Sequence, residues 1–228
     1  MPSRSNIFVI NYYYHIYNKT IDNLDPFNDV IVSDYFLNLV NYYRYSDLKM
    51  SYSETLRLEP DIKDQYWNHL KKSNKYKIEI LAFCLMPNHF HFLLKEKQDK
   101  GISKFMADVL NGLTRFSNII NKRKGPIFLP RFRSKPIMDE EQLIHVSRYI
   151  HLNPYVSGLI GRIDDIWYYP FSSAGEYINE TNNFLNTKHI LDLGYYLGNR
   201  NKYKRFVENE AEHGKTKALN KYASKWCH

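Results

Sequence analysis

The chain has few cysteines and lacks a long apolar run. Only 2 of its 228 residues are cysteine, Cys84 and Cys227, and they lie far apart in the sequence. So few thiols exclude a secreted scaffold held by several disulfides and fit a reducing compartment. No apolar run approaches the roughly 20 residues that cross a bilayer, and the first residues lack the apolar core of a cleavable signal peptide. We therefore expect a cytoplasmic protein with no membrane segment.

Acidic residues are also in the minority. The chain has 24 Asp and Glu against 32 Lys and Arg, which gives a net charge of +8. A positive protein attracts polyanions, because neutralising phosphates supplies most of the non-specific affinity for nucleic acid. Aromatic residues make up 16% of the chain and include 20 tyrosines, and such rings can stack on unpaired bases. A compositional bias towards Tyr, Asn, Lys and Ile accounts for both features equally well.

The pattern of apolar residues predicts an α+β fold. We expect strands at 8–17, 76–86 and 89–95, a short strand within 127–138, and helices at 30–45, 101–122 and 139–153. This order favours a mainly antiparallel sheet with helices packed on it. We expect residues 1–178 to form this domain. After the polar stretch 179–183, we expect residues 179–228 to form a small, helical, basic C-terminal extension.

Two histidines alternate with phenylalanines in the strand expected at 89–95. Side chains alternate along a strand, so His89 and His91 share one face, whereas Phe90 and Phe92 take the other and anchor the strand in the core. Two imidazoles at this spacing can bind one metal ion, and zinc is the default ion for such ligands. The alternative is a pair of histidines satisfied by ordinary hydrogen bonds.

A tyrosine and an asparagine lie one turn apart in the helix expected at 139–153. Tyr149 and Asn153 are four residues apart, so they share one face of the helix. A phenol can act as the nucleophile in phosphoryl transfer, and an amide oxygen can complete a metal site. We expect Pro154 to end this helix. Because tyrosine is abundant in the chain, these two residues alone do not identify a catalytic site.

The densest group of basic residues lies between the last two expected helices. It consists of Lys122, Arg123, Lys124, Arg131, Arg133 and Lys135. The functional interpretation is a surface that contacts DNA phosphates, and the alternative is a solvated loop. The positive net charge favours the first interpretation.

Taken together, these segments resemble the single-tyrosine HUH transposases, and among them the branch of REP-associated tyrosine transposases. The resemblance is carried, in the order of the family, by the motifs Leu85-Met86-Pro87-Asn88-His89-Phe90-His91-Phe92-Leu93-Leu94, Gly101-Ile102-Ser103-Lys104-Phe105-Met106, Arg131-Phe132-Arg133-Ser134, Ser147-Arg148-Tyr149-Ile150-His151-Leu152-Asn153-Pro154 and Tyr169-Pro170-Phe171-Ser172-Ser173. These motifs run from Leu85 to Ser173, and we expect the resemblance to cover most of residues 5–178. Five motifs in the same order are far more specific than any one of them.

The resemblance implies an HUH nuclease fold with a ferredoxin-like sheet, and it assigns roles to individual residues. Tyr149 would be the nucleophile, His89 and His91 the metal-binding pair, and Asn153 the polar residue that helps to hold the ion. The family's Mg²⁺ or Mn²⁺ then replaces zinc as the expected cofactor. The activity implied is metal-dependent cleavage and rejoining of single-stranded DNA through a 5′-phosphotyrosine link, at sites flanked by hairpin DNA.

The resemblance is incomplete in two places. The segment 8–20 matches only loosely, and Tyr155 stands where relatives commonly have an aliphatic residue. Tyr155 is therefore a second phenol near the expected site. The sequence leaves open whether the protein is a monomer or a homodimer, and whether it serves a mobile element or its host.

Two other functions compete with the nuclease. One is a non-catalytic nucleic-acid-binding protein that keeps the fold, although a binder needs neither the histidine pair nor the tyrosine. The other is an unrelated zinc hydrolase, which would need a third strong ligand. The candidates for that ligand are His15, His145 and His151.

Overall fold

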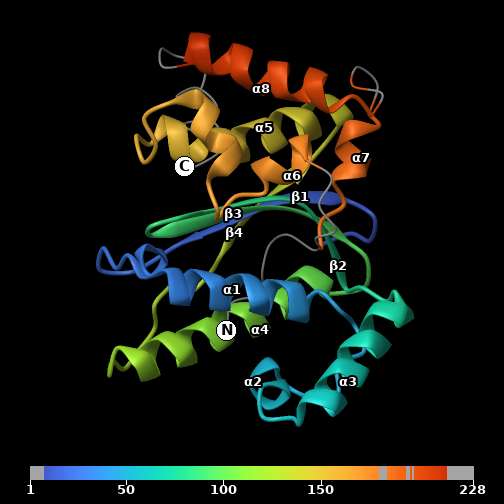
Figure 1. The fold of residues 1–228 in the computed structure, drawn as a ribbon, viewed down its shortest axis with the longest axis vertical. Coiled ribbons are helices and arrows are strands. Elements are labelled where there is room, and N and C mark those ends of the chain that lie inside the picture. Colours follow the sequence, from blue (N-terminus) through green and yellow to red (C-terminus); the bar gives the residue numbers. More distant parts are fainter. Residues whose placement is uncertain (1–7, 180–183, 194–195, 197, 215–228) are drawn as a thin grey trace.

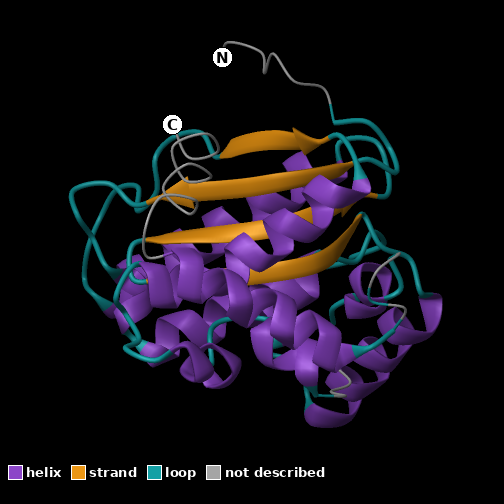
Figure 2. Cartoon of the chain, turned by 90° about the horizontal axis from the view of Figure 1, so that it is seen from above, coloured by secondary structure: helices purple, strands orange, loops and turns teal. Residues whose placement is uncertain are grey.

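The computed structural model describes residues 8–179, 184–193, 196 and 198–214. Within these residues, four strands form a sheet: β1 (Tyr13–Lys19), β2 (Ile78–Met86), β3 (His89–Glu96) and β4 (Arg133–Ile137). Figure 2 shows the strands side by side; their order is β2-β3-β1-β4, and each neighbouring pair is antiparallel. Strand β3 therefore lies inside the sheet, with a partner on each side.

Helices cover both faces of this sheet. They are α1 (Val30–Tyr43), α2 (Tyr52–Thr55), α3 (Pro60–Ser73), α4 (Gly101–Ile120), α5 (Glu140–Val156), α6 (Ala174–Ile178), α7 (Thr187–Leu191) and α8 (Arg200–Gly214), with short 3-10 turns η1 (Pro26–Asn28) and η2 (Ile163–Tyr168). Figure 1 shows α1 and α4 on one face and α5 to α8 on the other, with α2 and α3 beyond the first layer. The predicted α+β class with an antiparallel sheet and packed helices is confirmed.

Alternation along β3 divides the interior into two cores. Phe90 and Phe92 are fully buried with Phe36 of α1 and Phe105 of α4, in what we call the α1/α4 core. Leu93 faces the other way and is buried with residues of α5 and α8, in the α5/α8 core. Each fully buried phenylalanine contributes about 2–3 kcal/mol of hydrophobic stabilisation. The two phenylalanines thus fix which face of β3 the histidines occupy.

The C-terminal helices pack against α5. Tyr203 and Val207 of α8 are buried in the α5/α8 core together with Ile150 of α5. The guanidinium of Arg148, also on α5, lies 4.1 Å from the ring centroid of Phe206 on α8. The described part of the C-terminal segment therefore holds one side of α5, while the sheet holds the other.

Helix α5 runs further than the sequence predicts. It starts as expected, with Asp139 as N-cap accepting a hydrogen bond from the backbone N–H of Gln142 at 2.7 Å. Its expected end at Pro154 is wrong, because the helix continues to Val156 with the buried proline inside it. Proline removes a single N–H donor, and packing in the core tolerates that loss. Tyr155 therefore lies on the same helix as Tyr149.

Other boundaries differ at the ends of the elements. The first strand was expected at 8–17, but residues 8–12 form a loop in which Asn11 has a φ of 68°, and the strand begins at Tyr13. Helices α2 and α3 were not expected from the sequence. Cys84 is buried, as expected of a small core residue, whereas Cys227 and residues 215–228 of the expected extension lie outside the described residues. Among the helices described, none is long and apolar enough to cross a bilayer.

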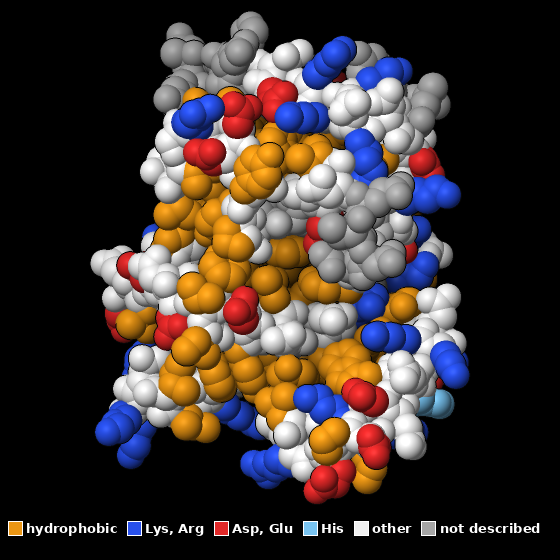
Figure 3. All heavy atoms as spheres, viewed as in Figure 1, with side chains coloured by type: hydrophobic (Ala, Val, Ile, Leu, Met, Phe, Trp, Pro, Cys, Tyr) orange, Lys and Arg blue, Asp and Glu red, His pale blue; other side chains and the backbone are white. Residues whose placement is uncertain are grey.

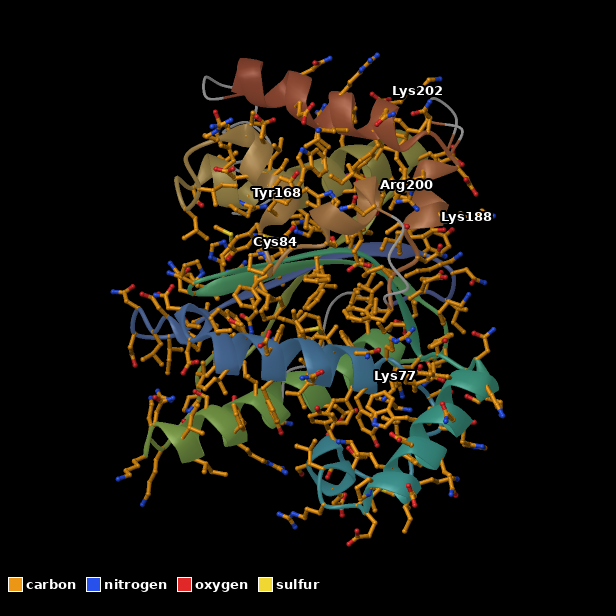
Figure 4. All side chains as sticks on the ribbon, in the orientation of Figure 1. Lys77, Cys84, Tyr168, Lys188, Arg200 and Lys202 are labelled. Atoms are coloured by element: carbon orange, nitrogen blue, oxygen red, sulfur yellow. The ribbon has the colours of Figure 1, made fainter. Side chains whose placement is uncertain are left out.

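The reversal from β3 into α4 depends on a carboxylate and a glycine. Buried Glu96 accepts hydrogen bonds from the backbone N–H groups of Gly101 and Ile102, both at 2.7 Å. These bonds satisfy two of the unpaired donors at the helix start, and the negative charge complements the helix dipole. Gly101 leaves no room for a side chain, because a Cβ there would collide with the backbone carbonyl of Lys77, which is labelled in Figure 4.

We expect Gly101→Ala to lower the free energy of unfolding by about 2–4 kcal/mol, because the added methyl group must displace backbone. Urea denaturation followed by circular dichroism measures this change. Gly161→Ala is the matched control, since a Cβ at Gly161 meets no atom within 4 Å. Equal stability of the two variants would contradict the proposed close contact.

Candidate active site

The two histidines of β3 stand on the face of the sheet that α5 covers. Strands β2 and β3 are joined through Pro87 and Asn88, and His89 and His91 follow at alternate positions. Their ring centroids lie 5.2 Å apart. His91 is buried and His89 half-buried, so the pair lies at the edge of a water-accessible region rather than on an open surface.

Neighbouring groups hold one nitrogen of each imidazole. The amide oxygen of Asn88 lies 2.7 Å from Nδ1 of His89; because this oxygen only accepts, Nδ1 carries the proton and Nε2 keeps its lone pair. Nδ1 of His91 lies 3.0 Å from Nε2 of His15 on β1. Metal-ligating histidines commonly have their second nitrogen held in this way.

Burial keeps all three imidazoles neutral. Desolvation, with the nearby cation of Lys19, lowers the pKa of His89 to about 4. Desolvation, with Lys135, lowers the pKa of His15 to about 3. The pKa of His91 lies well below its ordinary value because of burial and the two neighbouring histidines. At neutral pH, each of these side chains therefore has the charge state that metal ligation requires.

Helix α5 places Tyr149 beside this group. The Tyr149 ring centroid lies 5.6 Å from that of His91 and 5.8 Å from that of His15, both in edge-to-face arrangements. Asn153 follows one turn later, and its amide nitrogen donates to the backbone carbonyl of Tyr149 at 2.8 Å. This bond fixes the amide and leaves its oxygen for another partner. The structure thus brings His89, His91 and Tyr149 together, with Asn153 next to Tyr149 on the same helix.

A pocket of about 320 Å³ opens next to the histidines. Its lining residues are Tyr17, Asn18, Lys19, Asn88, His89, His91, Leu129 and Arg133. Tyr17 pairs with His91 in the sheet, so their side chains share a face, and their ring centroids lie 5.8 Å apart. The pocket therefore offers imidazoles, a tyrosine ring and cationic side chains within one small volume.

The basic residues singled out in the sequence fall into two groups. Arg133 and Lys135 lie on β4 opposite Tyr17 and His15, so they belong to the histidine face of the sheet. Arg131 lies instead in a second pocket, of about 470 Å³, between α4 and the loop 126–132. Lys122 and Arg123 lie in the turn after α4, where the Arg123 guanidinium donates to the Asn118 side chain at 3.2 Å. The structure thus places Arg133 and Lys135 on the histidine face, and Lys122, Arg123 and Arg131 away from it.

Elsewhere, the described surface carries basic residues that the sequence did not single out. Figure 4 shows Lys188, Arg200 and Lys202 on the same side of α7 and α8. Arg200 is tied into the fold, because it donates to the carbonyl oxygens of Glu176 and Tyr177 at 2.8 and 3.2 Å. On the face seen in Figure 3, apolar side chains gather in the middle and Lys and Arg lie mostly at the edges. This face therefore presents no continuous basic surface.

The donor set fits a divalent ion held by few protein ligands. His89 and His91 each have one nitrogen engaged by a neighbour, which leaves one for an ion, and Asn153 can add an amide oxygen. Among the described residues, no group of three or more His, Cys, Asp or Glu could hold a metal ion. Of these donors, the amide oxygen is the type that Mg²⁺ and Mn²⁺ prefer, whereas imidazole is more usual for zinc and the later transition metals; Mg²⁺ or Mn²⁺ would therefore need water or substrate oxygens as further ligands.

The other histidines do not complete a zinc site. Nε2 of His15 is hydrogen-bonded to His91. Nδ1 of His145 accepts a hydrogen bond of 2.7 Å from the Arg148 guanidinium, and the His145 ring contacts the Phe206 ring. His151 is buried between Tyr203 and Ser173, with a hydrogen bond of 2.8 Å to each hydroxyl. Sequence reasoning considered His15 only as a zinc ligand and missed its bond to His91, which alternation along β1 could have suggested.

A family model described as transposase IS200 like matches residues 49–153, which include β3, His89, His91, Tyr149 and Asn153. Over these residues, the chain is similar to the IS200-like transposases. Family and fold support a transposase-like role. No curated protein matches the sequence.

Two solved structures are similar to this chain. A REP-associated tyrosine transposase bound to a REP hairpin is 15% identical, with 78% of this chain and 86% of that chain covered and a TM-score of 0.53. A protein from Deinococcus radiodurans R1, assigned as a transposase, is also 15% identical, with 66% and 95% covered and a TM-score of 0.35. At this identity, the first similarity shows a shared fold.

Buried histidines make the stability of the fold depend on pH. Desolvation lowers the pKa of His151 from 6.5 to about 3. Between these values, the unfolded chain binds a proton that the folded protein does not, so stability falls as the pH drops below about 6.5. At pH 5, we expect this histidine to reduce the free energy of unfolding by about 2 kcal/mol relative to pH 7.5.

Urea denaturation at pH 7.5 and pH 5.0 measures this dependence. The His151→Gln variant cannot titrate, so its stability should change less with pH than that of the wild type, although its stability at pH 7.5 is lower. An identical change in wild type and variant would show that His151 is not the group responsible.

Proposed function

We propose that this protein cleaves and rejoins single-stranded DNA through a covalent link to Tyr149. The observation that carries the proposal is the position of the Tyr149 ring, 5.6 Å from the ring of His91. Metal-assisted phosphoryl transfer needs a nucleophile and ligands for the ion; here Tyr149 is the candidate nucleophile, and two neutral imidazoles and an amide oxygen are the candidate ligands. The IS200-like family and its shared fold support this role.

In the proposed reaction, the phenolic oxygen of Tyr149 attacks the phosphorus of a DNA phosphodiester. The bond from phosphorus to the 3′-oxygen breaks, and the 5′-phosphate becomes esterified to the tyrosine. The phenol releases its proton to water, and the departing 3′-oxygen takes one up. A 3′-hydroxyl from a second strand reverses these steps, so rejoining needs no ATP.

The candidate ligands are His89 and His91 through Nε2 and Asn153 through its amide oxygen. When bound, Mg²⁺ or Mn²⁺ supplies positive charge that polarises the scissile phosphate and stabilises developing negative charge. The hydrogen bond from Asn88 orients the imidazole of His89, and the hydrogen bond to the Tyr149 carbonyl orients the amide of Asn153. These contacts fix both side chains before DNA binds, which lowers the cost of assembling the site.

The pocket beside the histidines fits part of a nucleotide. Its cations, Lys19 and Arg133, can contact phosphate oxygens, and the Tyr17 ring can stack on an unpaired base. We propose single-stranded DNA with a flanking hairpin as the partner, because a structurally similar transposase was solved with a REP hairpin.

We expect purified protein to form a covalent adduct with labelled hairpin oligonucleotides from its genomic flanks when Mg²⁺ or Mn²⁺ is present. Tyr149→Phe should abolish the adduct and leave DNA binding nearly unchanged, because only the nucleophilic oxygen is lost. A denaturing gel detects the adduct, and EDTA should prevent its formation. Tyr155→Phe, a matched change on the same helix, should keep the activity.

Two results would contradict these assignments. An adduct that persists in Tyr149→Phe and disappears in Tyr155→Phe would move the nucleophile to Tyr155. Intact DNA binding with no adduct in any metal would instead indicate a non-catalytic nucleic-acid-binding protein.

We expect Arg133→Ala to weaken single-stranded DNA binding and to flatten its dependence on salt, because one phosphate contact is lost. Each such contact contributes about 0.7 to the slope of log K against log salt concentration. Fluorescence anisotropy at several salt concentrations in EDTA measures the slope. Lys49→Ala, at an exposed position outside the pocket, is the control. An unchanged slope for Arg133→Ala would remove this arginine from the DNA contact.

A further inference from the structure

Strand β1 places a third, fully buried histidine against the candidate metal ligand His91. His15 has no exposed surface, its Nε2 lies 3.0 Å from Nδ1 of His91, and the two rings are nearly parallel, with an interplanar angle of 25°. The other nitrogen of His15, Nδ1, is buried and has no hydrogen-bond partner among the described residues. Burying an unsatisfied polar atom costs stability, so His15 is a poor choice for packing alone.

The bond between the two imidazoles can be made in two ways, because each neutral ring carries one proton. In the first arrangement, His91 donates from Nδ1 to Nε2 of His15, and Nε2 of His91 keeps a free lone pair. In the second, His15 donates from Nε2, and His91 must carry its proton on Nε2. A proton on that nitrogen prevents it from ligating a metal ion. The direction of this one hydrogen bond therefore decides whether His91 can act as a ligand.

We propose that His15 is a positioning residue that accepts the Nδ1–H of His91 and so presents Nε2 of His91 to a divalent cation. This inference rests on the proposed metal-dependent function. In this arrangement, the proton of His15 resides on the buried Nδ1, which has no acceptor. The fold accepts this unfavourable group in exchange for a correctly oriented ligand, as is common at functional sites.

Histidine tautomers can be read directly in the wild-type protein. Long-range ¹H–¹⁵N NMR correlations, recorded with saturating Mg²⁺, should show His91 protonated on Nδ1 and unprotonated on Nε2. The same spectra should show His15 protonated on Nδ1. A proton on Nε2 of His91 in the Mg²⁺-loaded protein would overturn the proposal, and no variant has to fold for this result.

Variants test the consequence for metal binding. Titration calorimetry with Mn²⁺ should show a 10- to 100-fold weaker affinity for His15→Phe, the usual effect of losing a partner of a ligating histidine. His15→Gln should recover part of the affinity, because its amide oxygen can accept the same hydrogen bond. His145→Phe, a matched change of a half-buried histidine on α5, should bind Mn²⁺ like the wild type.

The stability of the variants shows whether His15 acts by positioning His91 or only by packing in the core. His15→Phe removes the unsatisfied Nδ1 of His15 but leaves Nδ1 of His91 without its partner, so its free energy of unfolding should stay close to that of the wild type. Mn²⁺ affinity of His15→Phe within about twofold of wild type, a spread expected of unrelated substitutions, would overturn the proposal. The proposal would also be overturned if the wild-type protein bound no Mn²⁺.

The adduct assay with Tyr149→Phe tests the proposed nuclease function separately from the proposed role of His15. A covalent DNA adduct together with unchanged Mn²⁺ affinity in His15→Phe would leave the nuclease standing and refute the role of His15. Weakened Mn²⁺ binding in His15→Phe with no adduct in the wild type would support the role of His15 and refute the nuclease.

Discussion

Strand β3 lies inside the sheet and is hydrogen-bonded on both sides, so its side chains can only alternate between two helical layers. Phe90 and Phe92 fill the α1/α4 core, and His89 and His91 are thereby directed towards α5. A shift of one residue in register would exchange the two sets and place imidazoles in an apolar core. Because that exchange would also remove two phenylalanines from the α1/α4 core, the packing of one face of β3 determines which side chains the other face presents.

The partner of this strand is α5, which is held by a buried polar network. His151 bonds to the hydroxyls of Tyr203 on α8 and Ser173, each at 2.8 Å. Ser173 in turn bonds to both backbone groups of Phe83 on β2, accepting from its N–H at 2.8 Å and lying 3.1 Å from its carbonyl oxygen. Satisfied buried networks of this kind specify one arrangement, because each member loses its partner if the helix slides. The network therefore fixes the height and rotation at which Tyr149 meets the histidines.

Local sequence patterns predicted the parts of the site that lie on one element. A two-residue period placed His89 and His91 on one face, and a four-residue spacing paired Tyr149 with Asn153. The contact between His15 and His91 was missed, because it spans 76 residues and depends on how β1 and β3 pair. The end of α5 was also misjudged, since a local rule for Pro154 was overridden by burial. Long-range register and packing are the information that local patterns lack.

Burial of the histidines links the site to the stability of the fold. A half-exposed imidazole would titrate near pH 6.5 and would be partly protonated under acidic conditions, whereas desolvation keeps His15 and His89 neutral down to a pKa of about 3 and about 4. The same desolvation means that acid favours the unfolded chain, because its histidines bind protons at a pH at which the buried histidines of the folded protein stay neutral. The unsatisfied Nδ1 of His15 adds to this cost. Burying these imidazoles therefore costs stability, because they would be better solvated in water. Part of the hydrophobic stabilisation from the core around Phe90 and Phe92 must offset this cost.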